Sequence, residues 1–166
     1  MLKTILSISG RPGLFRLVSH GKNMLIVESL ADKKKVPAYA KDKVISLGDI
    51  AIYTNDSEVP LHQVLNNILK KENGAKASIK TSATPDELRA YMAEILPEFD
   101  HDRVYPSDIK KLIMWYNLLI DSGFKDFTPL EELAAKAQEK QNNTEKAEQA
   151  EENNTQEEQA DTNEEA

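Results

Sequence analysis

The first part of the chain alternates short apolar runs with clusters of turn-forming residues. The runs occupy residues 2–8, 14–19, 24–30, 36–38, 44–47 and 49–54. Runs of this length, rich in branched side chains and separated by Gly, Pro, Asn and Asp, predict short antiparallel strands. Five or six such strands in so short a stretch favour a small closed or half-open antiparallel β-barrel of the Src-homology-3-like or KOW type.

A helical period replaces the strand pattern at about residue 60. After Pro60, apolar residues recur at the spacing i, i+3, i+4, i+7 and i+8; they are Leu61, Val64, Leu65, Ile68 and Leu69. This stripe predicts an amphipathic helix over about 60–71, which ends before the Asn-Gly pair at 73–74. We therefore place a β-domain with one helix at residues 1–80.

Residues 81–134 are predicted to form a short helical bundle. A Thr-Pro-Asp-Glu sequence at 84–87 is a strong helix start, and Pro97 closes that helix. The next helix, at about 107–122, is apolar nearly all round and must be covered on two sides. A second Thr-Pro start at 128–129 predicts a third helix. The predicted fold class is α+β.

Charge divides the chain into three parts. Residues 1–80 carry 13 basic and 7 acidic residues, a net +6, and residues 81–133 carry 5 and 11, a net −6. Residues 134–166 carry 3 and 10 and contain no large apolar side chain. Such a segment cannot bury enough apolar surface to offset its ordering entropy, so we predict a disordered acidic tail at 135–166. Its negative charge is expected to draw it to the basic β-domain.

The chain offers little catalytic chemistry. It has no Cys, which excludes disulfides, thiolate metal sites and a Cys nucleophile. The carboxylates at 98–102 lie between two predicted helices, but their spacing is not that of a calcium loop. Ser107 and Lys110 have an S-x-x-K spacing without the companion motifs of that enzyme class. We therefore predict no catalytic residue, no metal and no cofactor, and an enzyme is the third hypothesis.

The hydropathy pattern also bears on location. No apolar run approaches the roughly 20 residues of a membrane-spanning helix. The first residues lack the apolar core of a signal peptide. We expect a cytoplasmic protein with no membrane partner.

Cations and aromatic side chains are interspersed in the β-domain. Phosphate contacts from Lys and Arg beside stacking aromatic rings are how small barrels hold RNA. The first hypothesis is a non-enzymatic module that binds RNA or a ribonucleoprotein. Its candidate residues are Arg11, Arg16, Lys22, Lys33, Lys34, Lys35, Phe15 and Tyr39. The competing interpretation is that these lysines only keep the domain soluble and protect strand edges.

The second hypothesis is a protein–protein adaptor or a homo-oligomer that uses the helical part. The nearly all-apolar helix has a second stripe formed by Met114, Trp115 and Leu118. Aromatic and Met side chains are enriched at interface cores, which makes this stripe a candidate docking surface.

Several segments together resemble one bacterial family. They are residues 8–15 (ISGRPGLF), 26–30 (IVESL), 48–54 (GDIAIYT), 102–111 (DRVYPSDIKK) and 115–117 (WYN). The family is catalogued as a domain of unknown function, with an N-terminal part and a helical C-terminal part. The resemblance spans about residues 2–125 and implies a two-part cytoplasmic protein. It implies no activity, cofactor or catalytic residue.

Overall fold

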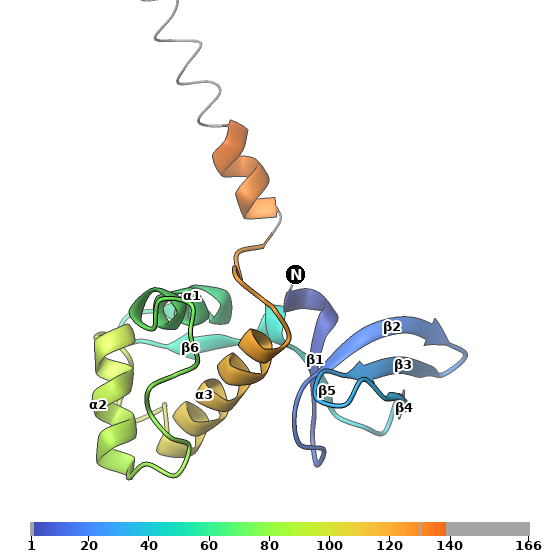
Figure 1. The fold of residues 1–166 in the computed structure, drawn as a ribbon, viewed down its shortest axis with the longest axis horizontal. Helices are drawn as coiled ribbons and strands as arrows, with labels where there is room; N and C mark the ends of the chain where they lie inside the picture. Colours follow the sequence, from blue (N-terminus) through green and yellow to red (C-terminus); the bar gives the residue numbers. More distant parts are fainter. Residues whose placement is uncertain (1, 130, 139–166) are drawn as a thin grey trace, which may run out of the picture. The chain divides into compact units, whose positions relative to one another are not determined.

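The computed structural model describes residues 2–129 and 131–138. The chain divides into two compact units, residues 1–128 and 129–166. The elements of the first unit are η1 (Leu2–Thr4), β1 (Ile5–Ile8), β2 (Phe15–Gly21), β3 (Met24–Ser29), β4 (Lys35–Tyr39), β5 (Val44–Ser46), η2 (Leu47–Asp49), β6 (Ala51–Tyr53), β7 (Glu58–Pro60), α1 (Leu61–Lys71), α2 (Pro85–Ile95) and α3 (Pro106–Asp121), where η is a 3-10 helix (Figure 1).

The second unit bears on the last part of the sequence prediction. Residues 131–138 are helical, as the Thr-Pro start at 128–129 predicted. The first four residues of the predicted disordered tail, 135–138, therefore belong to this helix, and the rest of the tail, 139–166, lies outside the described residues.

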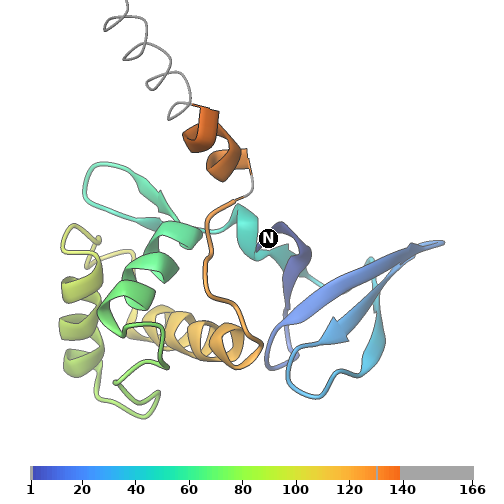
Figure 2. The same cartoon turned by 45° about the horizontal axis from the view of Figure 1, so that its top comes forward.

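The first five strands form one antiparallel sheet in the order β4-β3-β2-β1-β5. Strands β1 to β4 follow one another as a meander, and β5 returns to pair with the free side of β1. Figure 2 shows the β2–β3 hairpin extending away from the three helices. Within the described residues, the edge strands β4 and β5 do not pair with each other. The α+β class is therefore confirmed, but the sheet is not a closed barrel.

Strand β6 was expected to be a strand of the barrel, and this prediction is wrong. β6 pairs with β7 in a separate two-stranded sheet. The chain turns away at η2, where Gly48 lies against the backbone of η1. A Cβ on Gly48 would lie 3.0 Å from both Cα and N of Lys3, so only glycine allows this close approach.

Two apolar clusters stabilise the first unit. The smaller one is enclosed by the five-stranded sheet and contains the buried residues Leu6, Ile8, Phe15, Val27 and Ala38. The larger one joins all three α-helices to residues from the first part of the chain, which are Leu2, Ile5, Leu14, Leu30 and Leu47. Helices α1 and α2, on either side of residue 80, share this larger cluster. The division into domains at 1–80 and 81–134 stays a prediction.

The helix boundaries follow local capping chemistry. At α2, the predicted Thr84 cap accepts a hydrogen bond from the Glu87 N–H (3.3 Å), and the Glu87 carboxylate accepts one from the Thr84 N–H (2.8 Å). Helix α3 begins at Pro106, so the expected start at Ser107 is one residue late. No helix in the described residues is long and apolar enough to span a membrane.

Candidate functional site

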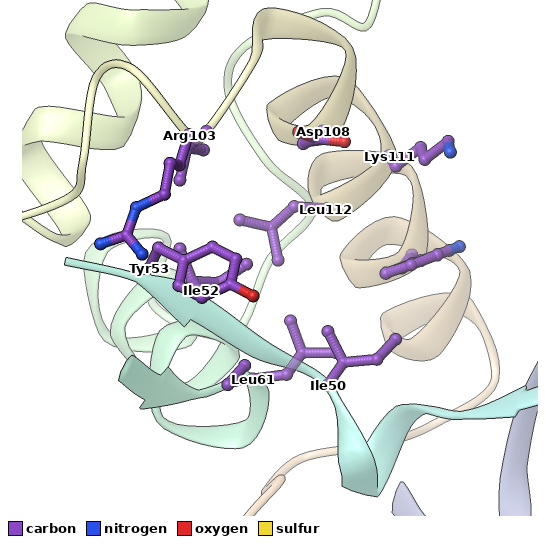
Figure 3. A pocket seen from close by; sticks show the side chains of 11 residues that line it. Ile50, Ile52, Tyr53, Leu61, Arg103, Asp108, Lys111 and Leu112 are labelled. Atoms are coloured by element: carbon purple, nitrogen blue, oxygen red, sulfur yellow. The ribbon is translucent and has the colours of Figure 1, made fainter. Parts of the chain in front are cut away.

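A pocket of about 250 Å³ lies between β6, the segment after α2, and α3 (Figure 3). Residues 50–53, Leu61 and the pair at 103–104 form one part of its lining. The α3 side chains that complete it are Asp108, Lys111, Leu112 and Trp115. Their spacing of i, i+3, i+4 and i+7 places them on one face of the helix. This face of α3 therefore forms one wall of the pocket.

The pocket runs from a buried apolar floor to an exposed polar rim. Leu61, Val104 and Leu112 are each less than 5% exposed. In Figure 3, Leu112 points into the space between α3 and β6. At the rim, Tyr53 is 41% exposed, and Lys111 is also exposed. The pocket therefore opens to solvent and can accept a ligand from outside.

Arg103 is held at the rim by three contacts. Its Nε donates to Oδ2 of Asp100 (2.7 Å), and one terminal nitrogen donates to the Thr54 carbonyl (3.3 Å). Its guanidinium lies 4.5 Å from the centre of the Tyr53 ring. Figure 3 shows these two side chains next to each other. The hydrogen bond from Arg103 holds the pKa of the Asp100 carboxyl below its usual value. The arginine is thus fixed in place before any ligand arrives.

Backbone pairing fixes the loop that carries Arg103. The Asp100 N–H donates to the Tyr53 carbonyl (2.9 Å), and the Asn55 N–H donates to the Glu98 carbonyl (3.0 Å). Thr54 also forms an isolated antiparallel bridge with Phe99. These contacts attach the loop at 98–103 to the end of β6 and give the pocket a defined wall.

The two charged α3 residues of the pocket differ in their roles. The Asp108 carboxylate accepts a hydrogen bond from the Tyr105 N–H (3.1 Å), so it caps the start of α3. Lys111 forms no ion pair with any residue that the structure describes. Lys111 therefore adds a positive charge, unpaired among the described residues, to a lining that also carries the Asp108 carboxylate.

The lining of the pocket mixes apolar and charged side chains. The pocket combines aliphatic side chains, two aromatic rings and two cations, and it contains no Ser, Thr, His or Cys. The His101 ring packs against Phe99 at a tilt of 35°, with the ring centres 4.1 Å apart. Among the described residues, no group of three or more His, Asp and Glu is placed to hold a metal ion. The arrangement suits an apolar group that carries negative charge beside it.

The predicted docking stripe on α3 is only partly available. Met114 is 37% exposed, whereas Trp115 and Leu118 are half-buried against the larger apolar cluster. Trp115 lines the pocket, and the other two residues do not. The stripe is therefore a pocket wall with an exposed methionine beside it, rather than one flat apolar surface.

Most of the predicted nucleic-acid-binding residues lie around one face of β2–β4, here called the outer face. Direct cross-strand pairing places Arg16, Glu28 and Lys35 in one row on it. Because side chains alternate along a strand, Ile26 with Pro37 and Met24 with Tyr39 form the next rows of this face. Lys22 follows β2 at the hairpin tip, and Lys33 and Lys34 precede β4.

Two of the predicted residues are placed differently from the others. Phe15 is 6% exposed and belongs to the smaller apolar cluster, so its ring cannot stack on a base. Its prediction as a binding residue is withdrawn. Arg11 lies 3.7 Å from the Asp42 carboxylate and donates to the Pro37 carbonyl (3.3 Å), so it ties the β1–β2 loop to β4. Arg16, Lys22, Lys33, Lys34, Lys35 and Tyr39 are exposed.

Sequence reasoning did not identify the pocket. Arg103 and Tyr53 lie in a loop and a short strand, and neither position follows a helical or alternating period. The Asp-x-x-Arg spacing of Asp100 and Arg103 was the available local signal, since such pairs often close a turn. The pairing of that turn with β6 is not visible in local sequence.

Two protein families match most of residues 2–119. Residues 2–47 match the family described as a domain of unknown function (DUF5606), and residues 50–119 match a second domain of unknown function (DUF6852). A solution NMR structure of a protein from Bacteroides vulgatus, a structural genomics target, is 64% identical. The match covers 76% of this chain and 91% of that one, with a TM-score of 0.66. No curated protein matches the chain.

Proposed function

We propose a function from geometry, because the chain belongs to the family of proteins that join these two domains of unknown function. In this proposal the protein is a non-enzymatic module that binds single-stranded RNA on the outer face of β2–β4. The observation that carries this proposal is the arrangement of exposed side chains on that face. Cations lie at both ends of it, and apolar and aromatic side chains lie between them.

The middle of the outer face suits bases. Tyr39 is 46% exposed, and its cross-strand partner is Met24. Small RNA-binding sheets present aromatic rings in this way, because every base has a flat face that can stack on them. The face spans residues 24–28 of β3, about 13 Å at 3.3 Å per residue, which is room for only a few nucleotides.

The ends of the outer face suit phosphates. Lys33 and Lys34 lie at one end and Lys22 at the other, and all three are exposed. Lys34 lies 3.6 Å from the Asp32 carboxylate, an exposed pair that contributes little and opens readily. Glu28 stands between Arg16 and Lys35 and balances part of their charge. The turn lysines are therefore the strongest candidates for phosphate contacts.

The test is fluorescence anisotropy with a labelled eight-nucleotide oligouridylate at 50 and 200 mM salt. We expect binding at low salt that weakens steeply as salt rises, because phosphate contacts release counterions. The triple variant Lys33→Ala, Lys34→Ala, Lys35→Ala should lower the slope of log affinity against log salt by about 2. Tyr39→Ala should cost about 1–3 kcal/mol in binding free energy without changing that slope.

A matched control removes the same charge from exposed positions elsewhere, by Lys80→Ala, Lys110→Ala and Lys125→Ala together. These substitutions should leave the affinity within about twofold of that of the unchanged chain. The proposal fails if no binding is detected at 50 mM salt. It also fails if the control triple variant loses as much affinity as the variant in the β3–β4 turn.

A further inference from the structure

The pocket described above lies apart from the outer face and supports a second kind of binding. Its lining comes from β6, the loop at 103–104, the start of α1, and α3, none of which contributes to the five-stranded sheet. A ligand in it would therefore contact none of the residues proposed to hold RNA. The evidence for this site is its size, its lining and its charge.

The size of the pocket limits its occupant. Sites for drug-sized molecules and cofactors usually enclose about 300–1,000 Å³. The pocket has a volume of about 250 Å³ and a floor of buried aliphatic side chains. A single aromatic side chain, inserted from a longer segment that stays outside, fits these dimensions better than a whole cofactor does.

The surroundings of the pocket suit a segment that extends beyond it. Exposed apolar side chains lie on the same elements that line it: Tyr53 on β6, Tyr105 beside the loop, and Met114 on α3. Tyr, Trp, Met and Arg are the residues enriched at the cores of protein–protein interfaces, and pockets of this kind receive anchor side chains. The contact surface for a peptide is therefore larger than the pocket itself.

The charged residues at the rim indicate which charge a bound segment should carry. The lining carries two cations, Arg103 and Lys111, and one carboxylate, Asp108. Arg103 is paired with Asp100 through its Nε (2.7 Å), whereas Lys111 forms no ion pair with a described residue. An incoming carboxylate can therefore approach Lys111 and the terminal nitrogens of Arg103, so acidic residues next to its anchor would be favoured.

We infer that this pocket is a docking site for an acidic peptide segment of a partner protein, which inserts one aromatic side chain between Tyr53 and Trp115 while its carboxylates face Arg103 and Lys111. The anchor fills the apolar floor. The carboxylates orient the segment along α3. Arg103, already fixed against Tyr53 and Asp100, loses little freedom when the segment binds, which favours affinity.

The chain carries its own reporter for this event. Trp115 is the single tryptophan of the sequence and lines the pocket. The experiment titrates the full chain with the peptide acetyl-Glu-Asp-Phe-Glu-Asp-amide and follows Trp115 emission and amide NMR shifts. We expect saturable changes confined to the lining residues and the exposed apolar side chains beside them. A peptide with Gly in place of Phe, and one with Lys in place of every acid, should each bind at least about tenfold more weakly.

Two neighbouring residues supply the matched variants. Lys111→Glu reverses a charge that lines the pocket, and Lys110→Glu reverses one that does not; both residues are exposed, so the fold should be kept. We expect the first substitution to weaken binding of the acidic peptide about tenfold and the second less than about threefold. The Lys33, Lys34 and Lys35 triple variant should bind the peptide as the unchanged chain does, which separates this inference from the RNA proposal.

Four results would overturn the inference. The first is no change in Trp115 emission at millimolar peptide, and the second is equal losses in the Lys110 and Lys111 variants. The third is phenylacetate binding as tightly as the peptide, which would make the pocket a small-molecule site. The fourth is a concentration-dependent change in Trp115 emission without peptide, which would indicate a second copy of the chain as the occupant.

Discussion

Single side chains hold the long connection between α1 and α2, which has no regular structure at 72–84. The Tyr116 hydroxyl donates to the Ala75 carbonyl (2.6 Å), and the Asn117 side-chain oxygen accepts from the Ala77 N–H (2.9 Å). The Tyr91 hydroxyl donates to the Glu72 carboxylate (2.7 Å). Residues of α2 and α3 thus take the place of the backbone pairing that this segment lacks.

The tyrosine in α3 gives the first prediction. Tyr116 is fully buried, so Tyr116→Phe keeps the ring packing and removes only the bond to Ala75. We expect a loss of about 1 kcal/mol in the free energy of unfolding, measured by urea denaturation. Tyr105→Phe is the control, because Tyr105 is 60% exposed and should change stability little. Equal stability of the Tyr116 variant would mean that this hydrogen bond does not help to hold the connection.

The carboxylate of Glu72 gives the second prediction. Burial raises its pKa, but hydrogen bonds from Tyr91 and Ser78 outweigh burial and hold the pKa below the ordinary value of 4.5. The folded chain therefore binds this proton less readily than the unfolded chain. The stabilisation is complete above pH 4.5 and is lost as the pH falls through the folded pKa.

The measurement is urea denaturation of the unchanged chain and of Glu72→Gln between about pH 6 and pH 3. The variant should lose less stability than the unchanged chain over this interval, because it lacks the group whose protonation destabilises the fold. Glu98→Gln serves as the control, since Glu98 is exposed and should keep the original slope. A variant slope identical to that of the unchanged chain would refute this role for Glu72.

At the scale of elements, a few backbone contacts determine where the chain changes direction. The sheet ends at β5, η2 redirects the backbone, and β6 then pairs with β7 beside α1. The Leu61 N–H donates to the Ile50 carbonyl (2.9 Å), which joins the start of α1 to the residue before β6. This joint places β6 opposite α3 and so creates the space that becomes the pocket.

The packing of η2 on η1 gives the third prediction. In Gly48→Ala, the new Cβ would lie 3.0 Å from backbone atoms of Lys3, which cannot move aside as a flexible side chain can. We expect a loss of about 1–3 kcal/mol, comparable to overpacking a core, measured by thermal or urea unfolding. Gly21→Ala is the control, because its Cβ would meet mainly the flexible Met24 side chain, at 3.1 Å. Equal losses in the two variants would contradict this account of η2.

At the scale of the whole molecule, the two family matches meet between residues 47 and 50, yet packing crosses that point. The larger apolar cluster takes Leu2, Ile5 and Leu47 from the first part and buried residues of all three α-helices from the second. The smaller cluster alone contains five buried residues. The five-stranded sheet thus depends on the helices for much of its buried surface.

This shared core gives the fourth prediction, made for two fragments. Residues 1–80 and residues 81–128, produced separately, should each show poorly dispersed amide NMR spectra and no cooperative unfolding. Each fragment exposes apolar side chains that the other covers in the full chain. A cooperatively folded fragment 81–128 would instead support the domain division at residue 80 that the sequence predicted.

Much of the architecture could be predicted from local sequence. The apolar period predicted α1 and most of α3, and the Thr-Pro-Asp-Glu sequence predicted the start of α2. Strands β1 to β5 were predicted from short apolar runs between turns, and β7 was missed because it has three residues and ends in proline. Helix caps, the apolar period of a helix and turns depend on residues a few positions apart. The sequence alone therefore predicts them.

Local sequence patterns are enough to place the helices, the strands of the sheet and the separation of charge, and the sequence contains no thiol. Tertiary packing, in contrast, places β6 outside the five-stranded sheet, buries Phe15 and brings Arg103 onto the Tyr53 ring in the pocket that Trp115 also lines. These last features depend on contacts between residues far apart in the chain. Tertiary packing sets such contacts, and local sequence propensities do not predict them.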